Sequence, residues 1–541
     1  TKRLEMFDIL AELFQKARPE EIDKIIYLTQ GELLPPFHGL MIGMSEKYLL
    51  RVIARVVDRP QEEVVELFRK EGDLGKTAER LIEGKGKGHS VVQVYDRLFS
   101  IAKISGEGSV ERKIETLSGI LSDASPKEAK YIARFVVGRL RMGAGDATVL
   151  EALAKARGDR ALRPDLERAY NITSDLGLVA RTLFTEGEEG VRRIRVRMSY
   201  PIRPALCERL SSAEEIVEKI GRCSVEMKYD GFRCQVHKSR KNVAIFSRNL
   251  ERTTPMFPEI VEAVNEYLAA PEAIIEGEAL AYDEATGDLL PFQVTIQRKR
   301  KHGIEEAAKS FPLRFYVFDL LYLNGEDFTE KPYAERRSML ASLVKKNGTM
   351  VLSEAIETDD PKEIVKFFDS GIERGLEGVV AKRLDTPYSA GSRNFNWIKL
   401  KRSYKGELSD TIDICIVGYF AGKGHRAQFG IGGILGAVYD SDSDTFKTVS
   451  RVGSGFTEEE WGRLKKTLDD TKISHKPARV DSLIEPDVWV TPTYVVTVTA
   501  DEITRSPSHT AGRDEQGIGY ALRFPRAQGW IREDKRAEDA N

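Results

Sequence analysis

One short stretch places three ionisable side chains on the same face of an expected strand. In SVEMKYDGFRCQVH, residues 224–237, the residues Glu226, Lys228 and Asp230 alternate with hydrophobic ones. Because successive side chains of a strand point to opposite faces, these three share a face. A lysine held between carboxylates in a cleft is suited to act as a nucleophile. The alternative is the solvated face of an antiparallel hairpin that turns at 230–231, and this segment alone favours neither.

Later segments that are expected to be strands also present lysine or glutamate residues. Trp397, Lys399 and Lys401 share a face in NWIKLK, and Glu276, Glu278 and Leu280 share one in IIEGEAL. In EGVVAK, Glu377 begins the segment and Lys382 follows. Singly, each is more often a surface residue. Together they indicate a sheet that lines a polar cleft, where lysines could grip phosphates and glutamates could hold a divalent metal.

Length and composition limit the classes of protein that fit. A chain of 541 residues is too long for one core and indicates three to four domains. The four cysteines form no CxxC pair, so neither a zinc site nor a disulfide framework is predicted. The sequence shows no apolar signal core and no apolar run of the ~18 residues that a membrane span needs. We therefore expect a soluble, intracellular protein with no membrane partner.

The overall charge gives no support for a nucleic-acid ligand, whereas local charge does. The formal net charge is −2, from 83 basic and 85 acidic side chains. Basic residues gather in VRRIRVR, in IQRKRKHG and in WIKLKRSYK. Phosphate contacts need only a basic face, so these clusters could bind nucleic acid, although each alone is more often a solvated surface.

The residue pattern divides the chain into three expected domains. Residues 1–190 are predicted to be helical; in SPKEAKYIARFVVGRLRMG, Ser125 and Glu128 form a capping box and Gly143 fits the end of the helix. Gly-rich turns between these helices could hold DNA phosphates or be plain loops. Residues 191–408 are predicted to be an α+β domain. Residues 409–541 are predicted to be a small antiparallel β-barrel, most economically a five-stranded oligonucleotide-binding barrel.

Seven ordered motifs carry a resemblance to a known family. EMKYDGFR resembles the KxDGxR nucleotidyltransferase motif, and SRN, EGEAL, YVFDLLYLNG, EGVVAK, WIKLK and RFPR…REDK follow in the family's order. The chain is similar to ATP-dependent DNA ligases of the archaeal and eukaryotic replicative type. RFVVGRLRMGAGDATVLEALA also resembles that family's helical DNA-binding domain, so the resemblance covers nearly the whole chain.

The resemblance implies a fold and an activity. The fold is an all-α DNA-binding domain, an α+β nucleotidyltransferase (adenylation) domain and an OB-fold β-barrel. The activity is the sealing of nicks in duplex DNA in replication, repair and recombination. ATP and Mg²⁺ are the implied cofactors, a lysyl-AMP and a DNA-adenylate are the intermediates, and the 3′-hydroxyl and 5′-phosphate ends are joined.

The resemblance also implies roles for individual residues. Lys228 is the implied nucleophile and must be neutral to attack, Glu226 reads the adenine amino group, and Phe318 stacks on the ring unless it belongs to the core. Glu278 and Glu377 are the implied metal ligands. Asp230 orients Lys228, and Arg532 and Lys535 orient the pyrophosphate after moving about a hinge near 405–410. The implied ATP-binding residues are Glu226, Arg233, Arg248, Glu278, Phe318, Arg393, Lys399, Lys401, Arg532 and Lys535.

Nicked double-stranded DNA is the expected partner of an expected monomer, which would be cytoplasmic and nucleoid-associated in a prokaryote. QVYDRLF, residues 93–99, has a faint likeness to a sliding-clamp-binding motif, so a clamp is a further candidate partner. An mRNA capping guanylyltransferase, an RNA ligase and a catalytically inactive DNA clamp remain as alternatives. An NAD-dependent ligase is disfavoured because its pattern of four zinc-binding cysteines is absent.

Overall fold

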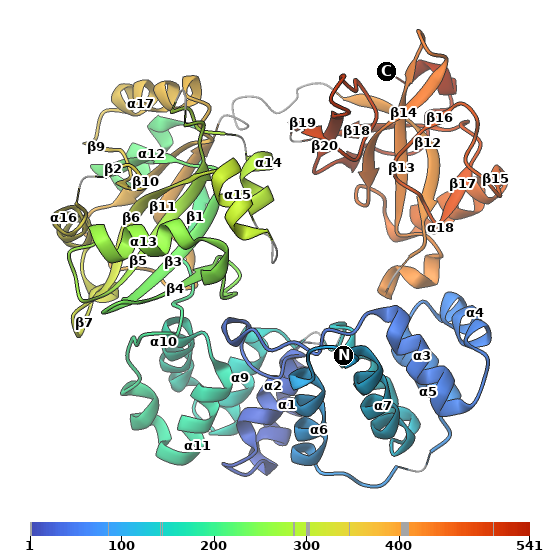
Figure 1. Cartoon of the computed structure of the whole chain (residues 1–541), viewed down its shortest axis with the longest axis horizontal. Helices are drawn as coiled ribbons and strands as arrows, with labels where there is room; N and C mark the ends of the chain where they lie inside the picture. Colours follow the sequence, from blue (N-terminus) through green and yellow to red (C-terminus); the bar gives the residue numbers. More distant parts are fainter. Residues whose placement is uncertain are drawn as a thin grey trace. The chain divides into compact units, whose positions relative to one another are not determined.

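The computed structural model describes residues 3–540, except 85, 141, 143, 285–286, 291, 299–302, 346, 402–410, 423 and 501. Contacts within the chain define two compact units, one of residues 1–58 and 81–402 and the other of residues 59–80 and 403–541. Figure 1 shows helices in the N-terminal region, both helices and sheets in the middle of the chain, and mainly strands in the C-terminal region. Across the described residues, no helix combines the length and the apolar character that crossing a membrane requires.

The N-terminal region is helical, as predicted. Its helices are α1 (Arg3–Lys16), α2 (Ile22–Gln30), α3 (Glu46–Val57), α4 (Gln61–Glu71), α5 (Leu74–Leu81), α6 (Val91–Lys103), α7 (Ser109–Ser122), α8 (Pro126–Val136), α9 (Asp146–Ala156), α10 (Arg163–Thr173) and α11 (Leu176–Arg192). Phe14, Ile26, Leu153 and Leu183 are fully buried in a core that α1, α2, α9, α10 and α11 share.

Helix α8 confirms the predicted start and corrects the predicted end. The Ser125 side chain accepts from the Glu128 backbone N–H, and the Glu128 carboxylate accepts from the Ser125 N–H at 2.7 Å. The helix ends at Val136, well before the predicted Gly143, because Gly138 takes a left-handed backbone with φ of +66° that breaks the helix. Gly143 itself lies outside the described residues.

The first of two sheets in the middle of the chain carries the stretch that contains Lys228. Its strands run in the order β1 (Leu206–Arg209), β11 (Arg393–Lys401), β10 (Gly378–Arg383), β2 (Cys223–Lys228) and β9 (Ala355–Thr358). Helices α12 (Ala213–Ile220) and α17 (Pro361–Glu373) pack against it (Figure 1). Val225 and Met227 join their hydrophobic core, so the alternate residues of β2 face away from that core.

The second sheet begins directly after the turn at 230–231. Its strands run in the order β4 (Asn242–Ser247), β3 (Phe232–Ser239), β5 (Glu272–Ala281), β6 (Leu313–Leu323) and β7 (Glu326–Asp327), and β8 (Met350–Leu352) pairs with β6. The helices of this part are α13 (Pro258–Tyr267), α14 (Phe292–Thr295), α15 (Ile304–Ser310) and α16 (Tyr333–Leu343).

The hairpin interpretation of residues 224–237 is therefore wrong. Strands β2 and β3 belong to different sheets and do not pair with each other. The face of β2 that holds Glu226 is not solvated, because Glu226 is 2% exposed. The turn between the two strands requires a glycine, since a Cβ on Gly231 would lie 2.3 Å from the carbonyl oxygen of Ala279.

The C-terminal region is built mainly of strands. They are β12 (Ile412–Phe420), β13 (Gly433–Asp440), β14 (Thr445–Val452), β15 (Lys472–Ile473), β16 (Val480–Asp481), β17 (Val488–Val490), β18 (Val495–Thr499), β19 (Glu502–Ser506), β20 (Gly519–Arg523) and β21 (Arg526–Ala527), with helix α18 (Glu458–Asp469) among them. The larger sheet has the order β15-β17-β12-β13-β14-β16, and β18 pairs with β12 and β21. Its pairs are antiparallel except β14–β16. Central strand β12 is buried on both faces.

Candidate active site

Strand pairing arranges ionisable side chains in rows across one face of the five-stranded sheet. The rows, read from β2 through β10 to β11, are Lys228–Gly378–Lys401, Glu226–Val380–Lys399 and Ser224–Lys382–Trp397. Residues opposite each other on paired strands are close neighbours on the same face. The residue types that alternate along three separate strands are therefore brought together, as the sequence predicts.

A pocket lies where this face meets the second sheet. From the first sheet it is lined by Glu226, Lys228, Val380, Lys382 and Trp397, and from the second by Arg233, Glu278 and Phe318. Cys207, Met227 and Tyr229 complete its lining. Of the predicted site residues, Glu226, Lys228, Arg233, Glu278 and Phe318 thus share one cavity.

Lys228 pairs with the carboxylate of Glu377, which also pairs with Lys401. Glu377 is held in place because its backbone N–H donates to the carbonyl oxygen of Lys228 at 3.1 Å. The next residue, Gly378, has a φ of +146°, and a Cβ there would lie 2.1 Å from the carbonyl oxygen of Leu400. An ammonium group has no free electron pair, so Lys228 could act as a nucleophile only after losing a proton, and its partner Glu377 can accept that proton.

Glu226 lies at the buried end of the pocket among hydrogen-bond donors. Its carboxylate accepts from Ser353 Oγ at 2.6 Å and from the Tyr333 hydroxyl, and Lys382 Nζ lies 2.8 Å away. Of these three residues, only Lys382 was predicted to lie at the cleft, and Tyr333 and Ser353 were not predicted. Tyr333 and Ser353 come from segments without a motif, whereas the alternation along EGVVAK was a signal for Lys382.

Glu278 faces the pocket from strand β5, directly opposite Arg233 of β3. Its carboxylate accepts from the Gly231 backbone N–H at 3.3 Å. Burial raises the pKa of Glu278 to about 7, and the charges of Lys228 and Arg233 oppose that rise. A carboxylate near its pKa at neutral pH gains charge readily when a cation approaches, which suits an oxygen ligand for a metal.

Phe318 reaches the pocket through an irregularity of strand β6. Glu276 pairs with Asp319 and Gly277 with Val317, so Phe318 is the extra residue of a β-bulge. The ring is half-buried and meets Trp397 edge-on, with centroids 6.2 Å apart. Phe318 therefore packs on neighbouring side chains and still lines the cavity.

Arg233 is tied to the protein by its guanidinium. It donates to the carbonyl oxygen of Ala205 and to Glu276, each at 2.8 Å, and to the Tyr388 hydroxyl at 3.3 Å. Its guanidinium carbon lies 5.5 Å from the centre of the Phe318 ring and 5.6 Å from that of Trp397. In this structure the residue supports the aromatic part of the pocket.

Lys399 lies among other cations. Burial lowers its pKa, and the charges of Arg393, Lys228 and Arg248 lower it further. Arg393 is exposed and donates to the carbonyl oxygen of Cys207 at 3.3 Å. These residues form a local positive field of the kind that binds phosphates.

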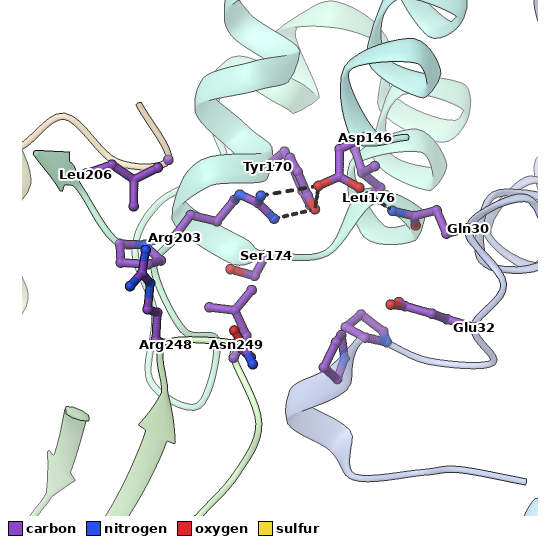
Figure 2. A pocket seen from close by; sticks show the side chains of 15 residues that line it. Gln30, Glu32, Asp146, Tyr170, Ser174, Leu176, Arg203, Leu206, Arg248 and Asn249 are labelled. Carbon is purple, nitrogen blue, oxygen red and sulfur yellow. Dashed lines mark hydrogen bonds and ion pairs between the residues drawn. The ribbon is translucent and has the colours of Figure 1, made fainter. Parts of the chain in front are cut away.

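Arg248 lies at a second cavity, shown in Figure 2, beside Asn249. In that view the Arg203 side chain points toward the helical region, where it meets Asp146 at 3.2 Å and donates to the Tyr170 hydroxyl at 2.6 Å. Residues of both the helical region and the following sheets thus line this cavity. The structure places Arg248 outside the pocket of Lys228 but within electrostatic reach of Lys399.

The last two predicted ATP-binding residues have partners within the C-terminal unit. Lys535 Nζ lies 2.5 Å from Asp413, and Arg532 donates to Asp534 at 2.6 and 2.7 Å and to Thr497 at 3.2 Å. The predicted hinge at 405–410 lies outside the described residues. The segment 93–99 lies in helix α6, and its Tyr95 and Leu98 side chains are buried.

Comparison of this sequence with known proteins shows the family to which the chain belongs. Residues 1–154 match the family model for the DNA ligase N terminus, 204–401 that for the ATP-dependent DNA ligase domain, and 427–535 that for the ATP-dependent DNA ligase C-terminal region. A protein named "Probable DNA ligase" from Dictyoglomus turgidum is 52% identical over 541 residues, which is all of this chain and 93% of that protein. The chain belongs to the ATP-dependent DNA ligase family.

Further relatives agree with the ligase assignment. "DNA ligase 2" of Thermofilum pendens is 44% identical over 560 residues and matches all of this chain and 93% of its own. A solved structure titled "Pmar-Lig_Pre." shares the fold, with a TM-score of 0.50 and 17% identity over 90% of the ligase and 99% of that chain. Membership in this family disfavours the capping guanylyltransferase and RNA ligase alternatives.

Proposed function

We propose that this ligase seals nicks in duplex DNA through an AMP adduct on Lys228. The supporting observation is the pocket that gathers Lys228, Glu226, Glu278 and Phe318 from two different sheets. Together these residues offer an amine, two carboxylates and an aromatic surface, which match the phosphate, ribose and base of a nucleotide. A binding protein without catalysis would not need the amine beside the carboxylates, so the geometry favours an enzyme over an inactive clamp.

In the first proposed step, Lys228 Nζ attacks the α-phosphorus of ATP. A phosphorus–nitrogen bond forms, the bond from the α-phosphorus to the bridging oxygen breaks, and pyrophosphate leaves with that electron pair. The amine proton passes to Glu377 or to water, since Glu377 already accepts from Lys228. Lys399 and Lys401 neutralise the charge that develops on the phosphate oxygens.

Two further transfers complete the reaction. An oxygen of the nick 5′-phosphate attacks the phosphorus of the lysyl-AMP, the phosphorus–nitrogen bond breaks, and a proton returns to Lys228. The 3′-hydroxyl then attacks the 5′-phosphorus of the DNA-adenylate, loses its proton, and expels AMP. Positioning and charge neutralisation supply most of the catalysis in such transfers. Arg393 and Arg248 would contact the phosphates in this proposal.

Magnesium is proposed as the metal that assists phosphate transfer. Glu278 and Glu377 offer the oxygen ligands that Mg²⁺ prefers, and Mg²⁺ is commonly held by one or two carboxylates together with substrate phosphates. The described residues contain no cluster of three or more His, Cys, Asp or Glu side chains that could bind a metal alone.

The division into three domains, at 190 and 408, belongs to the same proposal. The helical residues would bind DNA phosphates, and the C-terminal strands would form the oligonucleotide-binding barrel. In support, strands β12 and β14 share a hydrophobic core with helix α18, and this core includes Ile414, Val449, Trp461 and Leu464. Nicked duplex DNA is the proposed substrate of a monomeric enzyme, and a sliding clamp is a further proposed partner.

A sealing assay tests the proposed function. The full chain is incubated with ATP, Mg²⁺ and a labelled duplex that carries one nick, in matched DNA and RNA versions. We expect sealed DNA, with ATP consumed to AMP and pyrophosphate, and much less sealed RNA. Preferential sealing of the RNA duplex would restore the RNA ligase interpretation, and labelling of the protein by GTP without sealing would restore the capping interpretation.

Phe318→Ala should raise the KM for ATP by about tenfold or more, because stacking on a base contributes roughly 1–3 kcal/mol. Sealing of a pre-adenylated nick should change much less, since that reaction does not capture ATP. KM for adduct formation and the single-turnover sealing rate are the measurements. Equal losses in both reactions together with a lower Tm would show that Phe318 acts through packing.

A further inference from the structure

A buried lysine lies beside the carboxylate that is proposed to read the base. Lys382 of strand β10 is 2% exposed, and its Nζ lies 2.8 Å from Glu226. The two residues stand in neighbouring rows of the same sheet face, and both line the nucleotide pocket. Arg337 lies farther from Glu226, at 4.0 Å, and donates instead to Ser353 at 2.9 Å.

Three aromatic rings hold the ammonium group of Lys382. Its Nζ lies 4.3 Å from the ring centre of Trp397, 4.7 Å from that of Phe318 and 4.8 Å from that of Tyr333. It also lies 3.4 Å from the carbonyl oxygen of Phe318. Aromatic faces attract cations, most strongly where water is excluded. Residues on β6, β11 and α16 therefore fix the position of the Lys382 ammonium group beside Glu226. Burial lowers the pKa of Lys382, and the charges of Glu226 and Asp319 oppose that fall.

The charge on Glu226 decides which base its carboxyl can bind. Burial favours the neutral form of a carboxyl group, whereas an adjacent cation favours the carboxylate. A carboxylate can only accept hydrogen bonds, and a neutral carboxyl can also donate one. Adenine carries an amino donor at its C6 position and guanine carries a carbonyl acceptor there. A carboxylate thus suits adenine, and a neutral carboxyl would accommodate guanine.

We propose that Lys382 determines nucleotide specificity by keeping Glu226 ionised, so that the pocket accepts ATP and rejects GTP. This inference rests on the proposed nucleotide-binding role of the pocket. Lys382 acts through Glu226 and is a positioning residue. Tyr333 and Ser353 fix the orientation of the carboxylate, and Lys382 sets its charge.

The test measures protein labelling by ATP and by GTP, each with a radioactive α-phosphate. The ratio of the two kcat/KM values for adduct formation is compared in the full-length wild type, Lys382→Met and Lys382→Arg. We expect Lys382→Met to lower the preference for ATP by at least about tenfold. Without the lysine, the carboxyl of Glu226 could be neutral and donate to the guanine carbonyl instead of facing it as a second acceptor. Lys382→Arg keeps a cation beside Glu226 and should retain most of the preference.

A double variant separates this role from simple packing. The amide of Glu226→Gln can both donate and accept at any pH, so this variant should show weak base preference by itself. Adding Lys382→Met to Glu226→Gln should leave the ratio unchanged, because the two residues act in one pathway. A further change of the ratio in the double variant would show that Lys382 contacts the base directly, and would overturn the proposal.

Two other results also bear on the role of Lys382. If Lys382→Met labels more slowly with both nucleotides at an unchanged ratio, Lys382 has a structural role and the inference is wrong. If a melting curve shows that Lys382→Met fails to fold, Lys382→Gln replaces it. A lowered ratio of ATP to GTP labelling in Lys382→Gln supports the proposal, and an unchanged ratio overturns it. Absence of labelling of the wild type by ATP would instead contradict the proposed function itself.

Discussion

Lys228→Ala should form no detectable protein–AMP adduct and should still seal nicks that already carry AMP. The first reaction needs the amine as nucleophile, so its rate should fall by at least about 10⁴-fold. In the last reaction the 3′-hydroxyl is the nucleophile, and its rate should change by less than about tenfold. The measurements are single-turnover labelling with ATP and single-turnover sealing of a pre-adenylated nicked duplex.

Two further variants make the Lys228 result specific. Lys228→Arg retains a positive charge that can pair with Glu377 but cannot form the adduct, so it should behave as Lys228→Ala does in labelling. Lys366→Ala removes an exposed lysine of helix α17 and should leave both rates unchanged. A labelled adduct that survives in Lys228→Ala would assign the nucleophile to another residue.

Arg532→Ala and Lys535→Ala should each slow adduct formation by about 10²- to 10³-fold while largely sparing the sealing of pre-adenylated nicks. Pyrophosphate leaves in the first step alone, and an in-line displacement needs its leaving group held opposite the attacking amine. In this structure Lys535 pairs with Asp413, and Arg532 pairs with Asp534. The same two single-turnover rates, measured for each variant, test the prediction.

A matched arginine in the same unit provides the control. Arg479 pairs with Asp444 and Glu538. Its side chain is 45% exposed, and that of Arg532 is 36% exposed. Arg479→Ala therefore removes a comparable surface ion pair and should leave both rates nearly unchanged. Comparable losses of both rates in Arg532→Ala would contradict a role restricted to the first step.

Residue periodicity predicted which side chains share a sheet face better than it predicted which strands pair. Alternation along EMK, EGVVAK and WIKLK correctly placed Lys228, Lys399 and Lys401 on one face, because side chains of a strand alternate at a period of two wherever the strand pairs. The same alternation does not tell which strand pairs with which. A turn at 230–231 looks alike whether the chain folds back as a hairpin or passes into another sheet, as it does here.

Features that depend on long-range contacts were beyond the sequence. Phe318 points into the pocket through a β-bulge, and the extra residue is defined by the register with β5, which lies far away in the chain. Tyr333 and Ser353 reach Glu226 from separate segments that carry no distinguishing pattern. The helix that ends at Val136 shows a smaller limit, because the sequence predicted an end at Gly143 and the left-handed backbone of Gly138 breaks the helix earlier.

The position of the nucleotide pocket between two sheets has a mechanical consequence. Lys228 belongs to one sheet and Phe318 to the other, and the chain passes between the sheets at the turn beside Gly231. An AMP bonded to Lys228 and stacked on Phe318 would act as a strut that ties the sheets together. Adenylation would then stiffen the middle of the enzyme as well as activate it for reaction. Transfer of AMP to the 5′-phosphate would break the covalent link to Lys228 before the nick is sealed.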